Sequence, residues 1–256
     1  MGSPRKGNTY RACEEFREHL QKTCPAEFEY IWLKDSRIEP CRGCFACFPG
    51  GEDKCPCRDD DVRLIEQKML GADGVIFATP VYSVNVTGQM KTFIDRISYN
   101  GHRPQFFGKK AFFLVTTGIL GAGEVLDYLE KLTHAWGFEP AGKAGLITPN
   151  GPVPPDRAEK NTRVLEKGAA KYSASLLRKK QKSPGPHDVI YFYCLKGTFS
   201  GLEKISPADY RFWKNRGWLS PGAHYFTCVP VNPLYRAAGK FFEIYSKRSN
   251  DKNYNL

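Results

Sequence analysis

Apolar residues along the chain alternate between two kinds of pattern. Cys13, Phe16 and Leu20 recur every three or four residues, which is typical of one buried helix face. Short apolar runs closed by glycine or proline lie between such segments and are typical of buried strands. The pattern predicts strands over residues 28–33, 74–80, 110–118 and 141–148. It predicts helices around residues 13–20, 62–69, 88–97, 125–132 and 158–176.

Strands that alternate with helices predict the fold class. We expect an α/β protein with a doubly wound parallel sheet, covered by helices on both faces. Such sheets bind ligands in the crevice beyond the carboxyl ends of their strands. The residues that directly follow each strand are therefore the first candidates for a binding site.

Composition narrows the setting. The chain has 256 residues, enough for one large domain or a domain with an appendage. No apolar run approaches the roughly 20 residues that cross a bilayer, and the N-terminus lacks the apolar segment of a secretory signal. We therefore expect a cytoplasmic protein, in which clustered thiols serve metal or redox chemistry rather than structural disulfides.

The formal charge of +11 is spread along the chain and forms no basic stripe with a nucleic-acid reader motif. The sequence therefore argues against dedicated nucleic-acid binding. The charge fits a solvated basic face that steers anionic cofactors or acidic partner proteins.

Three predicted loops share one end of the sheet and suit a flat, phosphorylated ligand. Residues 2–9, GSPRKGNT, precede a helix and offer backbone N–H groups, hydroxyls and positive charge to a phosphate. Residues 80–85 offer a backbone turn and an aromatic side chain, and the glycines of residues 116–123 permit close backbone approach. Each loop alone also has a plain structural explanation, as a capped tail, a strand-to-helix connection or a loose glycine loop.

Together, and in this order, GSPRKGNT, TPVYSVNVTGQMKTFIDR and TTG resemble the flavodoxin-like NADPH-dependent FMN reductase family. The CxxCxxC segment followed by DDD resembles its iron–sulfur flavoprotein branch. The resemblance covers about residues 2–180 and implies a five-stranded flavodoxin-like domain that holds FMN. It implies a phosphate site formed by Ser3, Arg5, Gly7, Asn8 and Thr9. It also implies that the ribityl chain and ring lie along Pro80, Val81, Tyr82, Ser83, Val84 and Asn85, with Thr117 and Gly118 closing over the far side of the ring.

The chain departs from the family's pattern at its first residue. In the family an apolar strand in the middle of the sheet precedes the phosphate loop, whereas here Met1 stands directly before GSPRKGNT. A central gap would leave strand edges with unsatisfied N–H and C=O groups, each costing about 1–3 kcal/mol. We expect the native chain to extend upstream. Residues 188–195, DVIYFYCL, are the alternative source of a strand.

Five of the nine cysteines lie between residues 41 and 57, with no histidine among them. Zinc sites more often pair two distant CxxC knuckles or include histidine. Three closely spaced thiolates with a fourth nearby suit a 4Fe-4S cluster, whose corners need converging ligands. We predict that Cys41, Cys44, Cys47 and Cys55 are its ligands, with Cys57 as a rival for the fourth position. Bare thiols, zinc and a redox disulfide are the alternatives.

FMN would carry the chemistry, and the sequence suggests no general acid or base, so no catalytic residue is predicted. With a cluster, FMN would connect a hydride donor such as NAD(P)H with one-electron partners such as ferredoxin, or with a reducible small molecule. The alternatives are a cluster-free NAD(P)H-dependent FMN or quinone reductase and a binding module without enzyme activity. The resemblance also implies a homodimer or homotetramer.

The predicted domains are residues 1–182, the FMN-binding domain with its cysteine-rich insertion at 41–57, and residues 183–256, a C-terminal extension. In the extension, residues 207–219 look strand-like and residues 232–246 predict a basic amphipathic helix. We expect a packed subdomain, with a lid over the flavin, an oligomer contact or a membrane-surface contact as alternatives. Four isolated cysteines are expected to be buried or half-buried: Cys13, Cys24, Cys194 and Cys228.

Overall fold

The computed structural model describes residues 1–254, and the chain divides into two compact units. The first unit holds residues 1–42 and 59–179, and the second holds residues 43–58 together with those from 180 onward. The cysteine-rich segment thus divides between the two units, with the boundary between Arg42 and Gly43.

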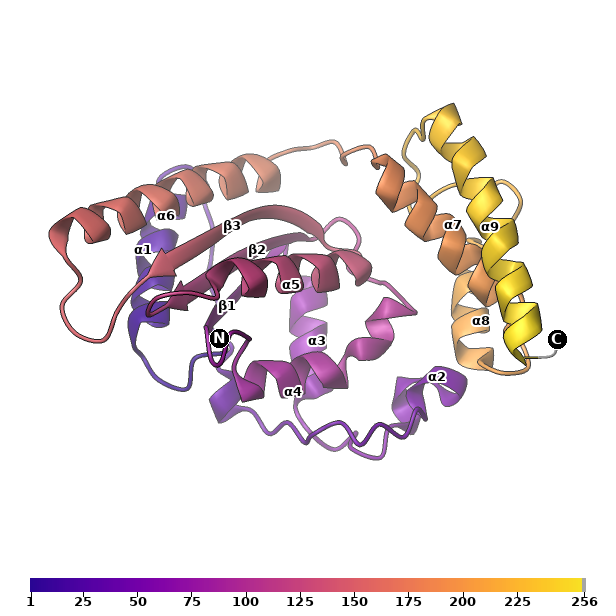
Figure 1. Cartoon of the computed structure of the whole chain (residues 1–256), viewed down its shortest axis with the longest axis horizontal. Coiled ribbons are helices and arrows are strands. Elements are labelled where there is room, and N and C mark those ends of the chain that lie inside the picture. The colour runs from indigo at the N-terminus through magenta and orange to yellow at the C-terminus, as the bar shows by residue number, and fades with distance from the viewer. Residues whose placement is uncertain (255–256) are drawn as a thin grey trace. The chain divides into compact units, whose positions relative to one another are not determined.

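A three-stranded parallel sheet forms the centre of the first unit (Figure 1). Its order is β1 (Gly74–Pro80), β2 (Lys110–Thr117) and β3 (Glu139–Ile147), so β2 is the middle strand. Every residue of β2 is buried, as expected for a strand that is covered on both faces and paired on both edges. All three strands coincide with predicted ones to within two residues.

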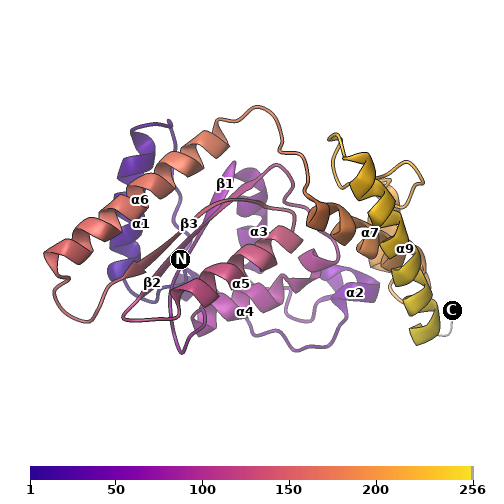
Figure 2. The same cartoon turned by 45° about the horizontal axis from the view of Figure 1, so that its top comes forward.

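Helices cover both faces of this sheet, which confirms the doubly wound α/β prediction. On one face α1 (Asn8–Gln21) and α6 (Pro155–Leu176) bury Phe16 and Tyr172 against Phe112 of β2. On the other face α3 (Val62–Gly71), α4 (Gly88–Arg96) and α5 (Ala122–Ala135) enclose an apolar cluster that includes Phe77 and Phe113. Figure 2 shows the same layers after a turn about the horizontal axis.

Residues 28–33 do not form a strand of the sheet, so the prediction of a strand there is wrong. Met1 and Gly2 connect this segment to β1: the Leu33 N–H donates to the Met1 carbonyl at 3.2 Å, and the Gly2 N–H donates to the Ala78 carbonyl at 2.7 Å. A segment counts as a strand only where a neighbour pairs along its length, and here the pairing is two residues long. The described residues therefore form three strands rather than the five that the family resemblance implies.

The second unit contains the helices α7 (Pro186–Ser200), α8 (Pro207–Asn215) and α9 (Pro233–Tyr254). The strand-like readings of residues 188–195 and 207–219 are wrong, because α7 covers the first segment and α8 most of the second. In α8 the buried Asp209 and Trp213 are four residues apart, which is a helical spacing. The predicted helix over residues 232–246 is confirmed as the larger part of α9.

Close helix packing and an aromatic core hold the second unit together. A Cβ atom on Gly239 of α9 would lie 2.1 Å from the ring of Tyr193, and one on Gly197 of α7 would lie 2.2 Å from the Glu243 carbonyl oxygen. The two glycines therefore let α7 and α9 approach each other closely. Beside them Phe192, Trp213 and Phe226 make ring contacts with centroids 4.8–5.9 Å apart.

The cysteine segment of the second unit contains two short helical turns, α2 (Cys47–Gly50) and η2 (Glu52–Lys54). Short 3-10 turns elsewhere are η1 (Leu33–Asp35) and η3 (Ser98–Gly101). None of the described helices is both long enough and apolar enough to cross a membrane.

Candidate functional site

Three loops meet where β1 and β2 end, and Thr116 connects them. Its hydroxyl lies 2.7 Å from the hydroxyl of Thr9, at the start of α1, and both groups are buried. Its carbonyl oxygen accepts from the N–H of Val81 at 2.8 Å. Thr117 directly follows Thr116 in the chain. The structure thus brings together Thr9, Val81 and Thr117, which come one from each of the predicted flavin loops.

The first loop, residues 2–9, is shaped by its own polar side chains. The buried Ser3 hydroxyl donates to the Arg5 carbonyl at 2.7 Å, and the Asn8 side-chain amide donates to the Thr148 carbonyl at 3.2 Å. Arg5 itself is exposed. Gly7 precedes α1 and has no side chain to cap the helix, so the first-turn N–H groups of α1 can be donated to an anion.

The first loop is also fixed to the start of α4. The Gly2 carbonyl accepts from the Thr87 hydroxyl at 2.8 Å and from the Gln89 side chain at 2.6 Å. Thr87 caps α4 as well, because its hydroxyl accepts from the Met90 N–H at 3.3 Å. The sequence places Thr87 at a helix start, where threonine is a common cap, but its bond to Gly2 depends on a contact between distant segments.

The second loop closes into a tight and strained turn. The N–H of Tyr82 donates to the Asn85 carbonyl at 2.8 Å, and the N–H of Asn85 donates to the Tyr82 carbonyl at 3.0 Å. Between them Ser83 and Val84 have φ values of 49° and 61°. A β-branched residue rarely adopts a positive φ, and such strain costs about 1–3 kcal/mol and is concentrated at functional sites. Val84 remains 49% exposed and Tyr82 47% exposed.

The third loop packs against the second. Thr117 donates its hydroxyl to the Leu120 carbonyl, which shapes the turn around Gly118. Gly121 has φ 89°, and a Cβ atom there would lie 2.9 Å from the Val81 side chain. Glycine is therefore required at this position, both for its backbone angle and for its close approach to the second loop.

Two side chains next to the predicted residues were not found from the sequence. Ile119 and Leu120 are 81% and 63% exposed at the tip of the third loop. Large apolar side chains exposed at neighbouring loop tips mark a surface that an apolar partner or ring can cover. Their only sequence signal is an apolar pair within a glycine-rich loop.

The residues of the three loops fit FMN in their chemistry. The open start of α1 and the Arg5 guanidinium suit a phosphate. The exposed apolar side chains of the second and third loops suit a flat ring. A separate cavity of the first unit, about 720 Å³ in volume, is lined by none of the predicted FMN residues.

The cysteine segment supplies thiols, which have the right chemistry for an iron–sulfur cluster. Cys41 and Cys44 are exposed, Cys47 and Cys55 are half-buried, and Cys57 is buried. Within the second unit the segment turns sharply at Phe45, with φ 57°, and at Gly51, with φ 90°. Among the described residues, no three cysteine, histidine or carboxylate side chains lie close enough together to hold a metal ion.

The helical part of the second unit holds this segment through α8. The Ser206 hydroxyl, at the start of α8, lies 2.9 Å from the Phe48 carbonyl of α2 and 2.7 Å from the carboxylate of Asp209. Ser206 and Asp209 are both buried. Ser206 lies 158 residues after Phe48, and no local pattern in the sequence indicates that the two residues are in contact.

The isolated cysteines mostly lie as expected. Cys13 and Cys24 are buried and Cys194 is half-buried, but Cys228 is exposed, so the prediction for Cys228 is wrong. It lies in the irregular segment between α8 and α9, where no helix or strand covers it. Burial raises the pKa of the Cys13 thiol to about 12, which leaves it protonated and unreactive at neutral pH.

Sequence similarity relates the chain to a known protein family. A model of the family described as NADPH-dependent FMN reductase matches residues 1–151. The chain belongs to this family. An iron–sulfur flavoprotein of Archaeoglobus fulgidus is 33% identical over 224 residues, which cover 86% of this chain and 97% of that protein. An iron–sulfur flavoprotein of Methanocaldococcus jannaschii is 42% identical over 96 residues, 37% of this chain and 48% of that protein.

Solved structures show the same fold. RosB, with a bound intermediate of riboflavin phosphate type, superposes with a TM-score of 0.56 at 18% identity, covering 68% of this chain and 74% of RosB. An FMN-dependent NADH-azoreductase from Bacillus anthracis, in complex with FMN, gives 0.52 at 13% identity, covering 66% of this chain and 92% of the azoreductase. These superpositions confirm the flavodoxin-like fold. Because the chain belongs to the NADPH-dependent FMN reductase family, it is an FMN-dependent oxidoreductase.

Proposed function

We propose that this member of the FMN reductase family is an electron-transfer flavoprotein that holds FMN in its first unit and a 4Fe-4S cluster on its cysteine segment. The spacing of Cys41, Cys44 and Cys47, with Cys55 as the fourth thiol, is the observation that carries the proposal. The match with an iron–sulfur flavoprotein over 97% of that protein's length supports it.

In this proposal the three loops hold the flavin. The FMN phosphate lies at the open start of α1, where the N–H groups of Asn8 and Thr9 and the side chain of Arg5 bind it. Ser3 and Gly7 shape the loop, and the Thr9 hydroxyl holds it against Thr116.

The flavin ring lies on the strained second turn in this proposal. Pro80 and Val81 lead out of β1, while the turn from Tyr82 to Asn85 presents backbone groups and apolar side chains to the ring. Thr117 and Gly118 form the opposite wall. When bound, FMN accepts a hydride and releases electrons one at a time, and the chain's own task is to bind it, orient it and shield it from water.

The thiols of Cys41, Cys44, Cys47 and Cys55 would hold the cluster, which supplies single-electron transfer when bound. Cys57 remains a rival for the fourth position, although it is 3% exposed and Cys55 is more accessible. We propose NAD(P)H or ferredoxin as electron donor, a ferredoxin or a reducible small molecule as acceptor, and a homodimer or homotetramer as the assembly.

A second candidate function is a cluster-free NAD(P)H-dependent FMN or quinone reductase. It is favoured by one observation: the described cysteines do not converge into a metal site. In that case the thiols of residues 41–57 would have no redox role, and the three flavin loops would be the whole active site.

Purification under anaerobic conditions separates the two functions. We expect a brown protein with about four iron atoms and four acid-labile sulfides per FMN. A yellow protein with flavin bands and no iron after anaerobic reconstitution with iron and sulfide would establish the cluster-free reductase instead. A colourless protein that does not take up FMN would contradict both.

A further inference from the structure

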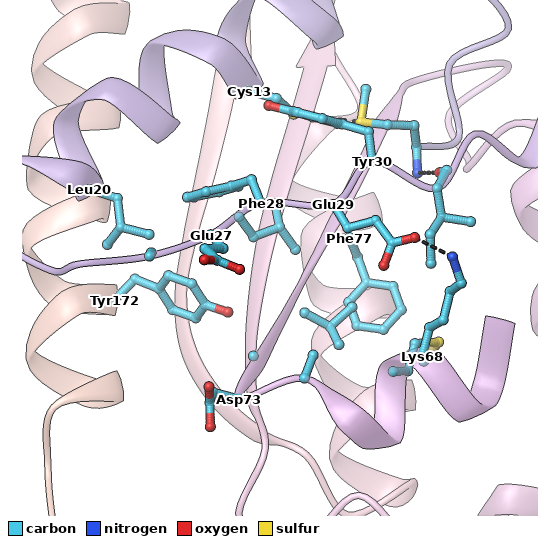
Figure 3. Close-up of a pocket in the computed structure, with 18 of the residues that line it drawn as sticks. Cys13, Leu20, Glu27, Phe28, Glu29, Tyr30, Lys68, Asp73, Phe77 and Tyr172 are labelled. Carbon is cyan, nitrogen blue, oxygen red and sulfur yellow. Dashed lines mark hydrogen bonds and ion pairs between the residues drawn. The ribbon is translucent and has the colours of Figure 1, made fainter.

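Apolar surface also lies outside the proposed flavin and cysteine sites. In the first unit it lines the cavity beside β1, where residues 25–31 and the neighbouring helices cover it (Figure 3). In the second unit it lies on α9 and is open to solvent. Four large apolar side chains of this helix are 54–76% exposed: Leu234, Phe241, Ile244 and Tyr245.

These four side chains lie on one side of α9. Leu234 and Phe241 are seven residues apart, which is close to two helical turns. Ile244 and Tyr245 follow Phe241 by three and four residues, which is close to one turn. Since an α-helix turns by about 100° per residue, the four side chains lie within about 100° of arc. This stripe is called the outer face of α9 below.

The opposite side of α9 is fixed against α7, and the two helices run side by side within the second unit (Figure 1). Gly239 packs on the ring of Tyr193, and the Asn250 side chain donates to the Thr198 carbonyl at 2.9 Å. Gly239 and Asn250 are eleven residues apart, so α9 is held along about three turns. Because these contacts hold the inner side of the helix, the outer face is presented without any rearrangement.

The exposed charges of α9 are all positive. Its two acidic residues, Glu243 and Asp251, are half-buried, and Glu243 pairs with Lys196 of α7 at 3.7 Å. Its exposed charged residues are the cations Lys240, Lys247, Arg248 and Lys252.

These cations surround the outer face in an order that suits a flat anionic surface. Arg248 and Lys252 continue the stripe beyond Tyr245, at spacings of three and seven residues. Lys240 and Lys247 lie along one flank of the stripe. The long apolar stems of lysine and arginine let their charges reach past an apolar layer to the anionic groups above it.

A second copy of the chain fits the outer face less well. In a two-fold pair of antiparallel α9 helices, each flank faces the same flank of the other copy. The flank with Lys240 and Lys247 would then meet like charges and no exposed carboxylate of α9. An anionic surface would meet all of the exposed cations favourably.

We propose that the outer face of α9 docks the protein on the surface of a lipid bilayer that contains anionic lipids. The helix lies in the plane of the surface, with Leu234, Phe241 and Tyr245 just below the headgroups and the cations among the lipid phosphates. None of the described helices is suited to crossing the bilayer, so the contact is with one leaflet. The docking depends on neither FMN nor a cluster and thus goes beyond the proposed function.

The test is sedimentation of the full chain, with the cofactors it holds when purified, together with lipid vesicles. Vesicles of phosphatidylcholine are compared with vesicles that also contain about 30% phosphatidylglycerol. We expect at least about tenfold stronger binding to the anionic vesicles, weakened on going from about 0.1 M to about 1 M NaCl because the charges are screened. Equal binding to both kinds of vesicle, or binding to neither, would overturn the proposal.

Phe241→Ser tests the apolar part of the contact. It should weaken binding to the anionic vesicles by about tenfold or more, because the phenyl ring leaves water on docking. Leu64→Ser in α3 is the matched control, since Leu64 is 52% exposed and lies in the other unit. If the two variants bind alike, α9 is not the docking surface. If Phe241→Ser separates an oligomer of the chain while the wild type leaves vesicles unbound, a second copy covers the face and the proposal is wrong.

The double variant Lys240→Glu with Lys247→Glu tests the charges. Each basic side chain near an anionic bilayer contributes roughly fivefold in binding, so the loss should be about 25-fold or more. Lys167→Glu with Lys171→Glu in α6 changes the net charge by the same amount at exposed positions of the first unit. This control should bind within about threefold of the wild type. Equal losses in the two double variants would show that only net charge matters and would contradict docking through α9.

Discussion

At the scale of single residues, the flavin loops depend on a few buried polar contacts. The hydroxyl of Thr116 bonds to the hydroxyl of Thr9, and its carbonyl accepts from the N–H of Val81. Since buried hydroxyls need partners, the loss of one member of the Thr9–Thr116 pair leaves the other unsatisfied. The contact is therefore more important for loop position than its single hydrogen bond suggests.

Replacing Thr116→Val should lower the free energy of unfolding by about 1–3 kcal/mol, because the Thr9 hydroxyl loses its partner. FMN should also bind more weakly, since the first loop is no longer held. The double variant Thr9→Val with Thr116→Val should recover part of the stability, because neither hydroxyl is then orphaned. Urea unfolding of the three variants and FMN titration measure both effects. Equal stability of the single variant and the wild type would show that the hydroxyl pair contributes nothing.

A second prediction at this scale concerns pH and His224. Its Nδ1 lies 2.8 Å from the Tyr193 hydroxyl and its Nε2 lies 2.7 Å from the Arg236 guanidinium. Burial, and then the charges of Arg236, Lys196 and Lys240, lower the pKa of His224 below 6.5. The unfolded chain therefore binds a proton that the folded chain does not, and stability falls as the pH drops through 6.5.

The measurement is the melting temperature of the wild type and of His224→Gln at about pH 7.5 and about pH 5.5. The wild type should lose more stability on acidification than the variant, which has no group to protonate at this position. Equal losses in the two proteins would mean that His224 does not contribute to the pH dependence.

At the scale of elements, glycines decide how closely α7 and α9 pack. Gly239→Ala should lower the free energy of unfolding by about 1–3 kcal/mol, because the new methyl group would overlap the Tyr193 ring. Gly123→Ala in α5 is the matched control, since a Cβ atom there meets no atom within 4 Å. The control should be neutral or slightly stabilising, as alanine favours helix. Thermal unfolding compares the two, and equal behaviour would contradict the close packing.

The contact between α8 and the cysteine segment gives a further prediction at this scale. Ser206→Ala removes the hydroxyl that lies 2.9 Å from the Phe48 carbonyl. Under the proposed function, iron and sulfide per FMN should fall, because the segment that carries Cys47 is held less firmly. Ser183→Ala, at an exposed position of the same unit, should leave the iron content unchanged. If the wild type holds iron and Ser206→Ala holds the same amount, α8 does not support the cluster.

At the scale of the whole molecule, the two proposed cofactors depend on different parts of the chain. The flavin loops and Cys41 belong to the first unit, whereas Cys44, Cys47 and Cys55 belong to the second, and none of these cysteines lies in a flavin loop. Variants of the cysteine segment should therefore change iron content and leave FMN content unchanged.

Cys55→Ser and Cys57→Ser separate the two candidates for the fourth ligand. We expect Cys55→Ser to lose most of its iron and sulfide while keeping one FMN, and Cys57→Ser to keep both. Iron, sulfide and flavin analysis after anaerobic purification gives the answer. The reverse result would assign Cys57 as the ligand. If both variants retain their iron, neither Cys55 nor Cys57 is the fourth ligand.

The sequence alone was enough to predict the three strands of the sheet and the helices around them, whereas the binding of FMN by the three loops stays a prediction. Apolar spacing is a local property, so β1, β2 and β3 could be located to within two residues, and the end of each strand indicated the binding loops. In the second unit the same local reasoning located the larger part of α9 but failed for α7 and α8. The aromatic residues of α7 and α8 suit strands as well as helices, and only their packing makes them helical.

Only the tertiary structure decided how distant segments meet. Thr116 joins loops that are more than 100 residues apart in the chain, and Ser206 reaches Phe48 across 158 residues. The cavity beside β1 likewise depends on where residues 25–31 lie relative to the sheet. Local sequence patterns determine which element a segment forms, whereas these contacts depend on burial and hydrogen bonding between elements, which no local pattern encodes.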